Sequence, residues 1–148
     1  MYLRRLNLTN FRAYERLQLD LQSGLTVFLG PNAAGKTSLL EAIHLLATTK
    51  SPRTNIDCEL VRWEAEVARV EGLFVSRSRR ETRLAVGLEG NCARGTSGKR
   101  LEVEGEVVSS ARDLIGRASV VMFAPDDLAI IKGGPSLRRR FLNTAIAQ

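Results

Sequence analysis

Apolar and polar residues alternate with a period of two in the first part of the chain. Tyr2, Leu3, Leu6 and Leu8 predict a first strand, and Leu17, Leu19 and Leu21 alternate with polar residues to predict a second. Thr9-Asn10 is expected to break the first strand. In the connection that follows, Phe11 is expected to pack inward, while Arg12 is placed where it could approach a bound ligand.

The pattern then changes to a short apolar run followed by helical spacing. Residues 25–29 are apolar or β-branched and are bounded by Gly24 and Gly30, which predicts a buried strand of a parallel sheet. Beyond a glycine-containing turn, the apolar residues recur at helical spacing and predict an amphipathic helix; they are Leu39, Leu40, Ile43, Leu46 and Ala47.

Alternation returns between residues 67 and 103, where three strands and their turns predict antiparallel hairpins. The turn at 76–80 carries three arginines, which are either solvated at a hairpin tip or in contact with DNA phosphates, and we do not count them as a site. Residues 90–98 are expected to form a loop. Further along, the sequence predicts a short helix capped by Ser109 or Ser110, a buried strand at 118–123, and a helix that starts at Pro135 or Ser136.

The glycine-containing turn spells G-x-x-x-x-G-K-[ST] and lies between the predicted strand and helix. Glycines at both ends of such a loop let successive backbone N–H groups converge on an anion. The lysine can reach the β- and γ-phosphates, the hydroxyl that follows can ligate Mg²⁺, and the helix dipole favours negative charge. The predicted nucleoside triphosphate site comprises Gly30, Pro31, Asn32, Ala33, Ala34, Gly35, Lys36, Thr37 and Ser38, with Thr37 as the metal ligand and Arg12 as a further phosphate contact.

Composition adds a possible partner and excludes some classes of site. The net charge is +6 and the pI is about 10.0, so nucleic acid or another polyanion is a reasonable partner. Cys58 and Cys92 lack metal-ligand spacing, which favours a reduced protein without structural zinc. His44, in the middle of the predicted helix, is expected to be structural. Since no apolar run is long enough to span a bilayer and no signal peptide is visible, we expect a soluble protein.

Several motifs together carry a family resemblance. The turn T-N-F-R-x-Y, the segment G-P-N-x-x-G-K-T-x-L-L-E-A-I, the later V-V-M-F-A-P-D-D-L and the K-G-G-P followed by R-R-R-F-L resemble the start of the RecF family. This family is a DNA-repair branch of the SMC-type ABC ATPases. The resemblance runs nearly end to end.

The resemblance implies a fold, a cofactor and partners. The fold is an α/β P-loop NTPase lobe of the ABC/SMC-head type, with a mixed sheet plus antiparallel hairpins, and residues 1–148 are its N-terminal ATP-binding lobe. The cofactors are ATP and Mg²⁺. In the full-length protein, the resemblance implies an ATP-dependent homodimer that binds single-stranded and gapped DNA, works with RecO and RecR in recombinase loading and SOS induction, and is cytoplasmic.

The sequence also departs from what an ATPase needs. An acidic pair, Asp126 and Asp127, follows an apolar run, but Pro125 intervenes and the segment is not a Walker B strand. ABC ATPases carry a metal-sensing glutamine in this connection, and this chain has none there. A Walker B strand and a signature loop are both missing, so the chain is expected to be a fragment that binds ATP without hydrolysing it.

Two alternatives remain open at this point. One is the head of another DNA-repair ATPase, such as RecN or an SMC protein, whose sequence would continue into long heptad repeats. The other is a stand-alone P-loop kinase. A GTPase is disfavoured because the Asn-Lys-x-Asp motif that reads guanine is missing.

Overall fold

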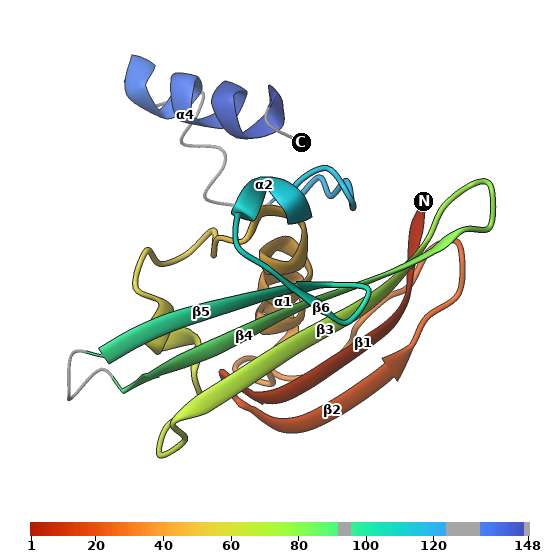
Figure 1. The fold of residues 1–148 in the computed structure, drawn as a ribbon. Coiled ribbons are helices and arrows are strands. Elements are labelled where there is room, and N and C mark those ends of the chain that lie inside the picture. The colour runs from red at the N-terminus through yellow and green to blue at the C-terminus, as the bar shows by residue number, and fades with distance from the viewer. Residues whose placement is uncertain (92–95, 124–133, 147–148) are drawn as a thin grey trace.

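A six-stranded antiparallel sheet dominates the computed structural model, which describes residues 1–91, 96–123 and 134–146 (Figure 1). The strands lie in the order β2-β1-β3-β4-β5-β6. Their bounds are β1 (Tyr2–Phe11), β2 (Tyr14–Asp20), β3 (Val67–Val75), β4 (Glu81–Asn91), β5 (Thr96–Val103) and β6 (Glu106–Val108). Every neighbouring pair is antiparallel, so the predicted hairpins are confirmed.

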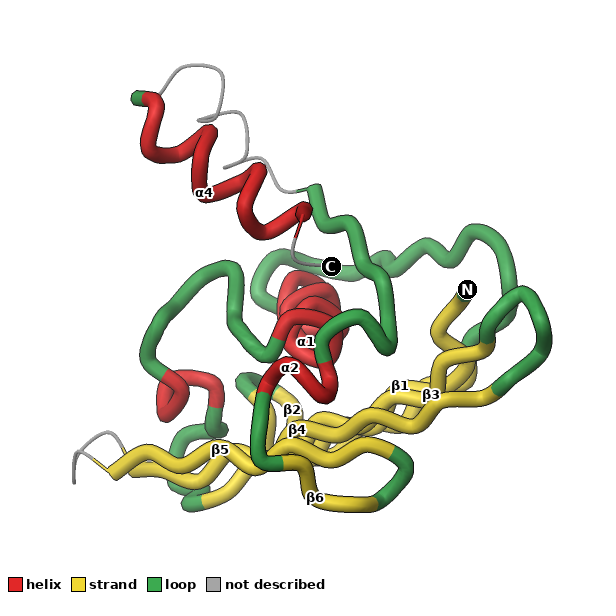
Figure 2. Tube along the Cα trace, turned by 45° about the horizontal axis from the view of Figure 1, so that its top comes forward, coloured by secondary structure: helices red, strands yellow, loops and turns green. Residues whose placement is uncertain are grey.

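The helical elements pack against one face of this sheet. Helix α1 (Lys36–Thr48) and the short helix α2 (Ala111–Leu114) lie on the same side of the strands (Figure 2), and a 3-10 turn, η1 (Asp57–Leu60), contacts β4 and β5. A further helix, α4, spans Pro135–Ile146. As predicted, Ser110 caps α2, because its hydroxyl accepts a hydrogen bond from the N–H of Arg112 at 3.2 Å.

Alternation along the strands decides which sheet face is buried. Every second residue on β1, β3 and β4 packs beneath α1, whereas the residues between them face away from α1 and are largely polar. Phe11 is fully buried, as predicted, and Leu40 on α1 remains 45% exposed although the sequence placed it with the apolar face. The buried set includes Leu6, Leu8, Leu39, Leu45, Leu46, Val70, Phe74, Leu84, Val86 and Leu88.

Helix α1 approaches β3 closely at Gly72. A Cβ added there would lie 2.7 Å from Cδ1 of Leu46 and 3.2 Å from Cδ1 of Leu3. These separations are shorter than van der Waals contact, so the glycine sets how near the helix can come to the sheet. This packing fixes α1, and with it the loop that precedes the helix.

Both strands predicted from continuous apolar runs are wrong. Residues 25–29 have no strand structure, and Leu25 and Leu29 are 93% and 90% exposed. At 118–123, Ala118 is buried, but Val121 is 93% exposed and the segment is again not a strand. A strand of a parallel sheet needs hydrogen-bonding neighbours, and within the described residues no strand pairs with either segment.

The strand bounds differ from the prediction at two turns. Strand β1 continues through Thr9-Asn10 to Phe11, and β4 and β5 extend into the region 90–98 that was predicted as a loop. Long antiparallel pairing sustains these ends, since Asn91 is still paired with Thr96. The predicted acidic connection at Asp126 and Asp127 lies outside the described residues, as does most of the turn that precedes α4.

The prediction of reduced cysteines is wrong for Cys58, which is disulfide-bonded in η1. The sequence holds one other cysteine, Cys92, which lies outside the described residues. Sequence spacing did not show this because η1 reaches the β4–β5 hairpin only through the fold. His44 is half-buried with Nδ1 at 3.0 Å from the carbonyl oxygen of Lys50, which agrees with the structural role predicted for it.

Candidate functional site

The loop that joins residue 30 to α1 holds a conformation that most side chains disfavour. Ala33 and Gly35 have φ values of +64° and +86°, and the N–H of Ala34 donates to the carbonyl of Pro31 at 3.3 Å. Where residues with left-handed and right-handed backbone conformations follow one another, successive backbone N–H groups can point toward a common centre. The positive φ values therefore turn the backbone sharply just before α1.

Tyr14, at the start of β2, packs directly on this loop. A Cβ added to Gly35 would lie 2.8 Å from the Tyr14 hydroxyl oxygen and 2.9 Å from Cζ, so both the positive φ and the close approach require glycine here. Burial raises the pKa of the Tyr14 phenol, which stays a neutral donor with its oxygen 3.5 Å from the carbonyl oxygen of Ala34. Sequence reasoning assigned Tyr14 no role, because nothing along the chain shows that β2 starts beside the loop.

Lys36 closes over the beginning of the loop. Its Nζ donates to the carbonyl oxygens of Gly30 at 2.8 Å and Pro31 at 2.6 Å. The ammonium group thus lies inside the turn that the backbone forms, rather than extending into solvent. In this position it can exchange carbonyl partners for the oxygens of a phosphate, which form stronger, charge-assisted hydrogen bonds.

The first turn of α1 is left open for an anion. Its N-cap is Gly35, no side chain accepts a hydrogen bond there, and the first turn contains no acidic residue. The first N–H groups of a helix have no intrahelical acceptors, and their dipoles favour a negative ligand. Thr37 is exposed at this end and Ser38 is buried. The donor set therefore fits a phosphate group, and the Thr37 hydroxyl is accessible to a hard cation that a phosphate would bring.

Arg12 contacts α1 rather than the loop. Its Nε donates to Glu41 Oε2 at 3.0 Å and its Nη2 to Glu41 Oε1 at 2.8 Å, a bidentate ion pair. The remaining Nη1 donates to the carbonyl of Glu59 at 2.8 Å. All three guanidinium nitrogens are therefore engaged within the protein. These bonds use three of the five guanidinium N–H donors. The phosphate contact predicted for Arg12 stays a prediction.

Glu41, which sequence reasoning missed, is the centre of this cluster. Its side chain is fully buried and also accepts a hydrogen bond from the Ser51 hydroxyl at 2.6 Å, while Arg53 lies 3.8 Å away. A buried carboxylate is stable only when charged and hydrogen-bonding groups surround it. Its position five residues after Lys36 on the helix that follows the loop is the one sequence signal that could have identified it.

The predicted site residues therefore fall into two groups. Those from Gly30 to Ser38 form one continuous turn and helix start, and Pro31, Asn32, Ala33 and Ala34 are exposed along it. Arg12 lies behind this turn on the buried Glu41. This arrangement can hold an anion at the N-terminus of α1 through a lysine, backbone N–H groups and an accessible hydroxyl. Such a donor set defines the phosphate-binding loop of a nucleoside triphosphatase.

Comparison with known proteins supports this class. The family model described as an AAA domain matches residues 5–112, which include the loop, α1 and most of the sheet. The chain belongs to this family of P-loop ATPases. Within the described residues, no helix has both the length and the apolar content needed to cross a membrane.

Over its whole length the chain is similar to RecF. It is 44% identical to the DNA replication and repair protein RecF of Listeria welshimeri and 42% identical to that of Halalkalibacterium halodurans, covering 100% of this chain and 38% of each relative. The chain thus spans less than two-fifths of the length of these curated relatives. The RecF resemblance inferred from motifs is confirmed.

Solved structures show the same relation in three dimensions. A structure titled as the recombination mediator protein RecF-ATPrS in the RecFOR pathway matches with a TM-score of 0.89 at 35% identity, covering 99% of this chain and 38% of that one. A RecF-ATP structure matches with a TM-score of 0.86 at 35% identity, covering 98% of this chain and 39% of that one. An SMC head domain from Thermotoga maritima shares the fold. It matches with a TM-score of 0.63 at 21% identity, covering 80% of this chain and 43% of that one. The predicted fold class is therefore confirmed.

Proposed function

We propose that residues 1–148 are the ATP-binding lobe of a RecF-like DNA-repair ATPase. The observation that carries this proposal is the loop itself, with Lys36 Nζ held inside the turn and the uncapped helix start of α1 beyond it. Two similar structures, of RecF-ATPrS and of RecF-ATP, support adenine nucleotide as the ligand.

In this proposal the loop amides and Lys36 hold the β- and γ-phosphates, and Thr37 ligates Mg²⁺. The cation would neutralise charge on the triphosphate. Ser38, next to Thr37 on α1, and the residues from Gly30 to Gly35 complete the phosphate contacts. Tyr14 acts by positioning Gly35, since its ring lies against that residue.

The wider role follows from similarity to RecF. We propose a cytoplasmic protein that forms an ATP-dependent homodimer, binds single-stranded and gapped DNA, and works with RecO and RecR in recombinational repair and SOS induction. The positive charge of the chain, +6, is compatible with a DNA ligand. Because the chain spans 38% of its curated relatives, these activities belong to the whole protein and are proposals here.

Replacing Lys36 with alanine tests the nucleotide site. Loss of the ammonium group removes the charge that a triphosphate would meet, so we expect ATP affinity to fall by about a hundredfold or more, as for loss of a strong charge-assisted contact. A fluorescent ATP analogue titrated into the wild-type protein and the Lys36→Ala variant measures the change, and competition with GTP measures base selectivity.

Thermal unfolding of both proteins provides the control. Lys36 contacts only backbone carbonyls of its own loop among the described interactions, so the melting temperature should change little. Equal ATP affinity in the two folded proteins would overturn the assignment of the site.

A further inference from the structure

The turn between β3 and β4 displays three arginines on a braced backbone. The N–H of Ser76 donates to the carbonyl of Arg80 at 2.9 Å, and the N–H of Arg79 donates to the carbonyl of Ser76 at 3.0 Å. The N–H of Arg80 also donates to the Ser76 hydroxyl at 3.1 Å. Arg77, Arg79 and Arg80 are all exposed. The turn therefore presents its charges from a fixed conformation, which lowers the entropy lost when a ligand is bound.

The acidic side chains near this end of the sheet already have basic partners. Glu81 pairs with Arg4, and Asp20 pairs with Arg5 at 2.6 Å, an interaction that lowers the pKa of the Asp20 carboxyl. The arginines of the turn have no such partner among the described residues.

Farther along the same sheet face, Arg69 neutralises two more carboxylates. It lies 2.7 Å from Glu102 and 3.3 Å from Glu71, and its hydrogen bond to Glu102 is the main reason that the pKa of that carboxyl is lowered. Arg83, the next arginine on β4 after the turn, is exposed and has no ion pair within the described part of the chain. Together Arg77, Arg79, Arg80 and Arg83 form a patch of unpaired positive charge, which we call the hairpin patch.

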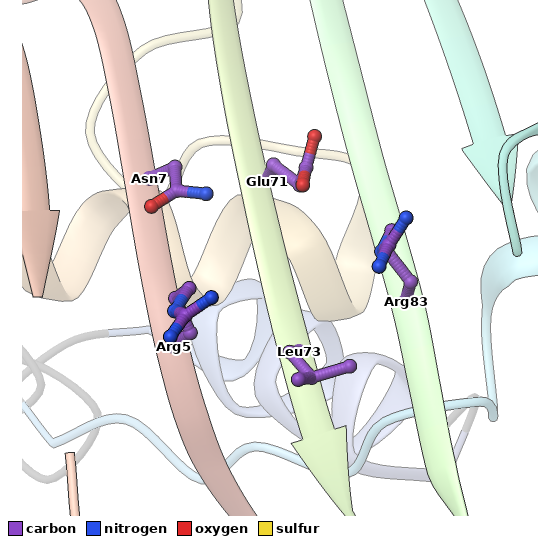
Figure 3. A pocket seen from close by; sticks show the side chains of 5 residues that line it. All are labelled: Arg5, Asn7, Glu71, Leu73 and Arg83. Atoms are coloured by element: carbon purple, nitrogen blue, oxygen red, sulfur yellow. The ribbon is translucent and has the colours of Figure 1, made fainter. Parts of the chain in front are cut away.

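A shallow hollow lies at the inner end of the hairpin patch, on the sheet face that carries no helix (Figure 3). It is lined by Arg5, Asn7, Glu71, Leu73 and Arg83. Asn7 directs its amide nitrogen toward Glu71 (Figure 3), and its buried amide oxygen has no hydrogen-bond partner among the described residues. The patch thus continues from the turn onto the open face of the sheet.

The hairpin patch is remote from the nucleotide loop. Val75, just before the turn, pairs with Tyr2 at the start of β1, whereas the loop contacts Tyr14, which pairs with Phe11 at the end of β1. Nine steps of about 3.3 Å along an extended strand place the two sites about 30 Å apart. In Figure 1 the turn accordingly lies beside the N-terminus.

We propose that the hairpin patch contacts the phosphate backbone of DNA. Guanidinium groups bind phosphate oxygens bidentately, and a row of unpaired arginines on a rigid turn matches a chain of regularly spaced phosphates better than it matches a single small anion. The inference rests on the proposed function in DNA repair and adds the surface that the DNA would meet. An acidic protein surface would also carry negative charge, and it becomes the favoured partner if loss of the patch charges leaves DNA affinity and its salt dependence unchanged.

The test compares two charge-matched double variants of the purified protein. Arg77→Ser with Arg80→Ser removes two patch charges and retains the backbone hydrogen bonds of the turn, and Arg79 is left because its φ of +61° makes substitution ambiguous. The control, Arg16→Ser with Arg117→Ser, removes two exposed arginines elsewhere that have no ion pair among the described residues. DNA affinity is measured by fluorescence anisotropy with gapped duplex DNA at several salt concentrations.

We expect the patch variant to lose at least about tenfold in DNA affinity. The magnitude of the slope of log K against log salt should fall by about 2, because each lost phosphate contact removes about 0.9 from it. The control should change the affinity by less than about threefold. Both variants should keep wild-type ATP affinity. Equal losses in the two variants, or an unchanged slope in the patch variant, would overturn the proposal while leaving the DNA-repair function standing. Wild-type protein that binds no DNA would instead refute the DNA-binding part of the proposed function itself.

Discussion

At the scale of single residues, Glu41 shows how one buried charge organises the surroundings of the nucleotide loop. Its carboxylate is inaccessible to solvent and receives hydrogen bonds from Arg12 and Ser51, which come from the β1–β2 turn and from the segment after α1. Removing a carboxylate from water costs several kcal/mol, so these partners must all be in place for α1 to sit where it does.

Arg12→Ala should therefore destabilise the fold. Deleting one partner of a buried, bidentate ion pair leaves an uncompensated charge, and we expect a loss of about 3 kcal/mol in the free energy of unfolding, measured by urea denaturation. Adding Glu41→Gln to Arg12→Ala should restore part of the loss, because the charge itself is then removed.

The same Arg12→Ala variant also tests the phosphate contact predicted from sequence. Since the guanidinium group is held by Glu41 and by the carbonyl of Glu59, ATP affinity measured well below the melting temperature should change by less than about threefold. A loss of tenfold or more in the folded variant would mean that Arg12 contacts the nucleotide.

At the scale of elements, the position of α1 over the sheet depends on Gly72. The side chain of Leu46 on α1 packs directly over Gly72 of β3, with the side chains of Phe74 and Leu3 beside it. Interiors packed this tightly accommodate an added methyl group only by moving a neighbour.

Gly72→Ala should consequently cost about 1 to 3 kcal/mol of stability, since the new Cβ would lie 2.7 Å from Cδ1 of Leu46. Gly87→Ala on β4 is a matched control, because the nearest atom to its added Cβ is 3.6 Å away. Alanine in a strand restricts the unfolded chain more than glycine does, so the control should be neutral or slightly stabilising. Equal urea midpoints for the two variants would contradict the proposed packing role of Gly72.

At the scale of the whole molecule, the described part of the chain combines a six-stranded antiparallel sheet with two apolar segments that pair with none of its strands. Leu25, Val27 and Leu29 precede the nucleotide loop and are exposed, as are Val121 and Phe123 near the end of the described core. Phe28 and Val120 nevertheless pack against the core. The segments are therefore anchored at single positions while their other side chains face solvent.

We expect residues 1–148 to bind ATP without turning it over. Hydrolysis needs an acidic metal ligand, a positioned base and charge stabilisation at the γ-phosphate, and the sequence has neither a Walker B strand nor a signature loop. Holding ground and transition states equally tightly does not accelerate a reaction. Phosphate release by the purified chain, measured with Lys36→Ala as the blank, should be undetectable. Release that depends on Lys36 would make Asp126 and Asp127 catalytic candidates.

Sequence alone determined the features whose physical cause is local. Period-two alternation identified β1, β2, β3 and β4, because side chains on successive strand residues point to opposite faces. The motif at 30–37 predicts a nucleotide loop, since its conformation depends on glycines and its chemistry on the lysine and threonine that follow directly. Helical spacing of apolar residues located α1, because residues three and four positions apart lie on the same face of a helix.

Tertiary structure decided what depends on residues far apart in the chain. The pairing of Arg12 with Glu41 and the packing of Tyr14 on Gly35 both join separate segments, and no local pattern encodes them. Residues 25–29 have the composition of a buried strand, yet a strand forms only where a neighbour supplies backbone hydrogen bonds, and within the described residues none does.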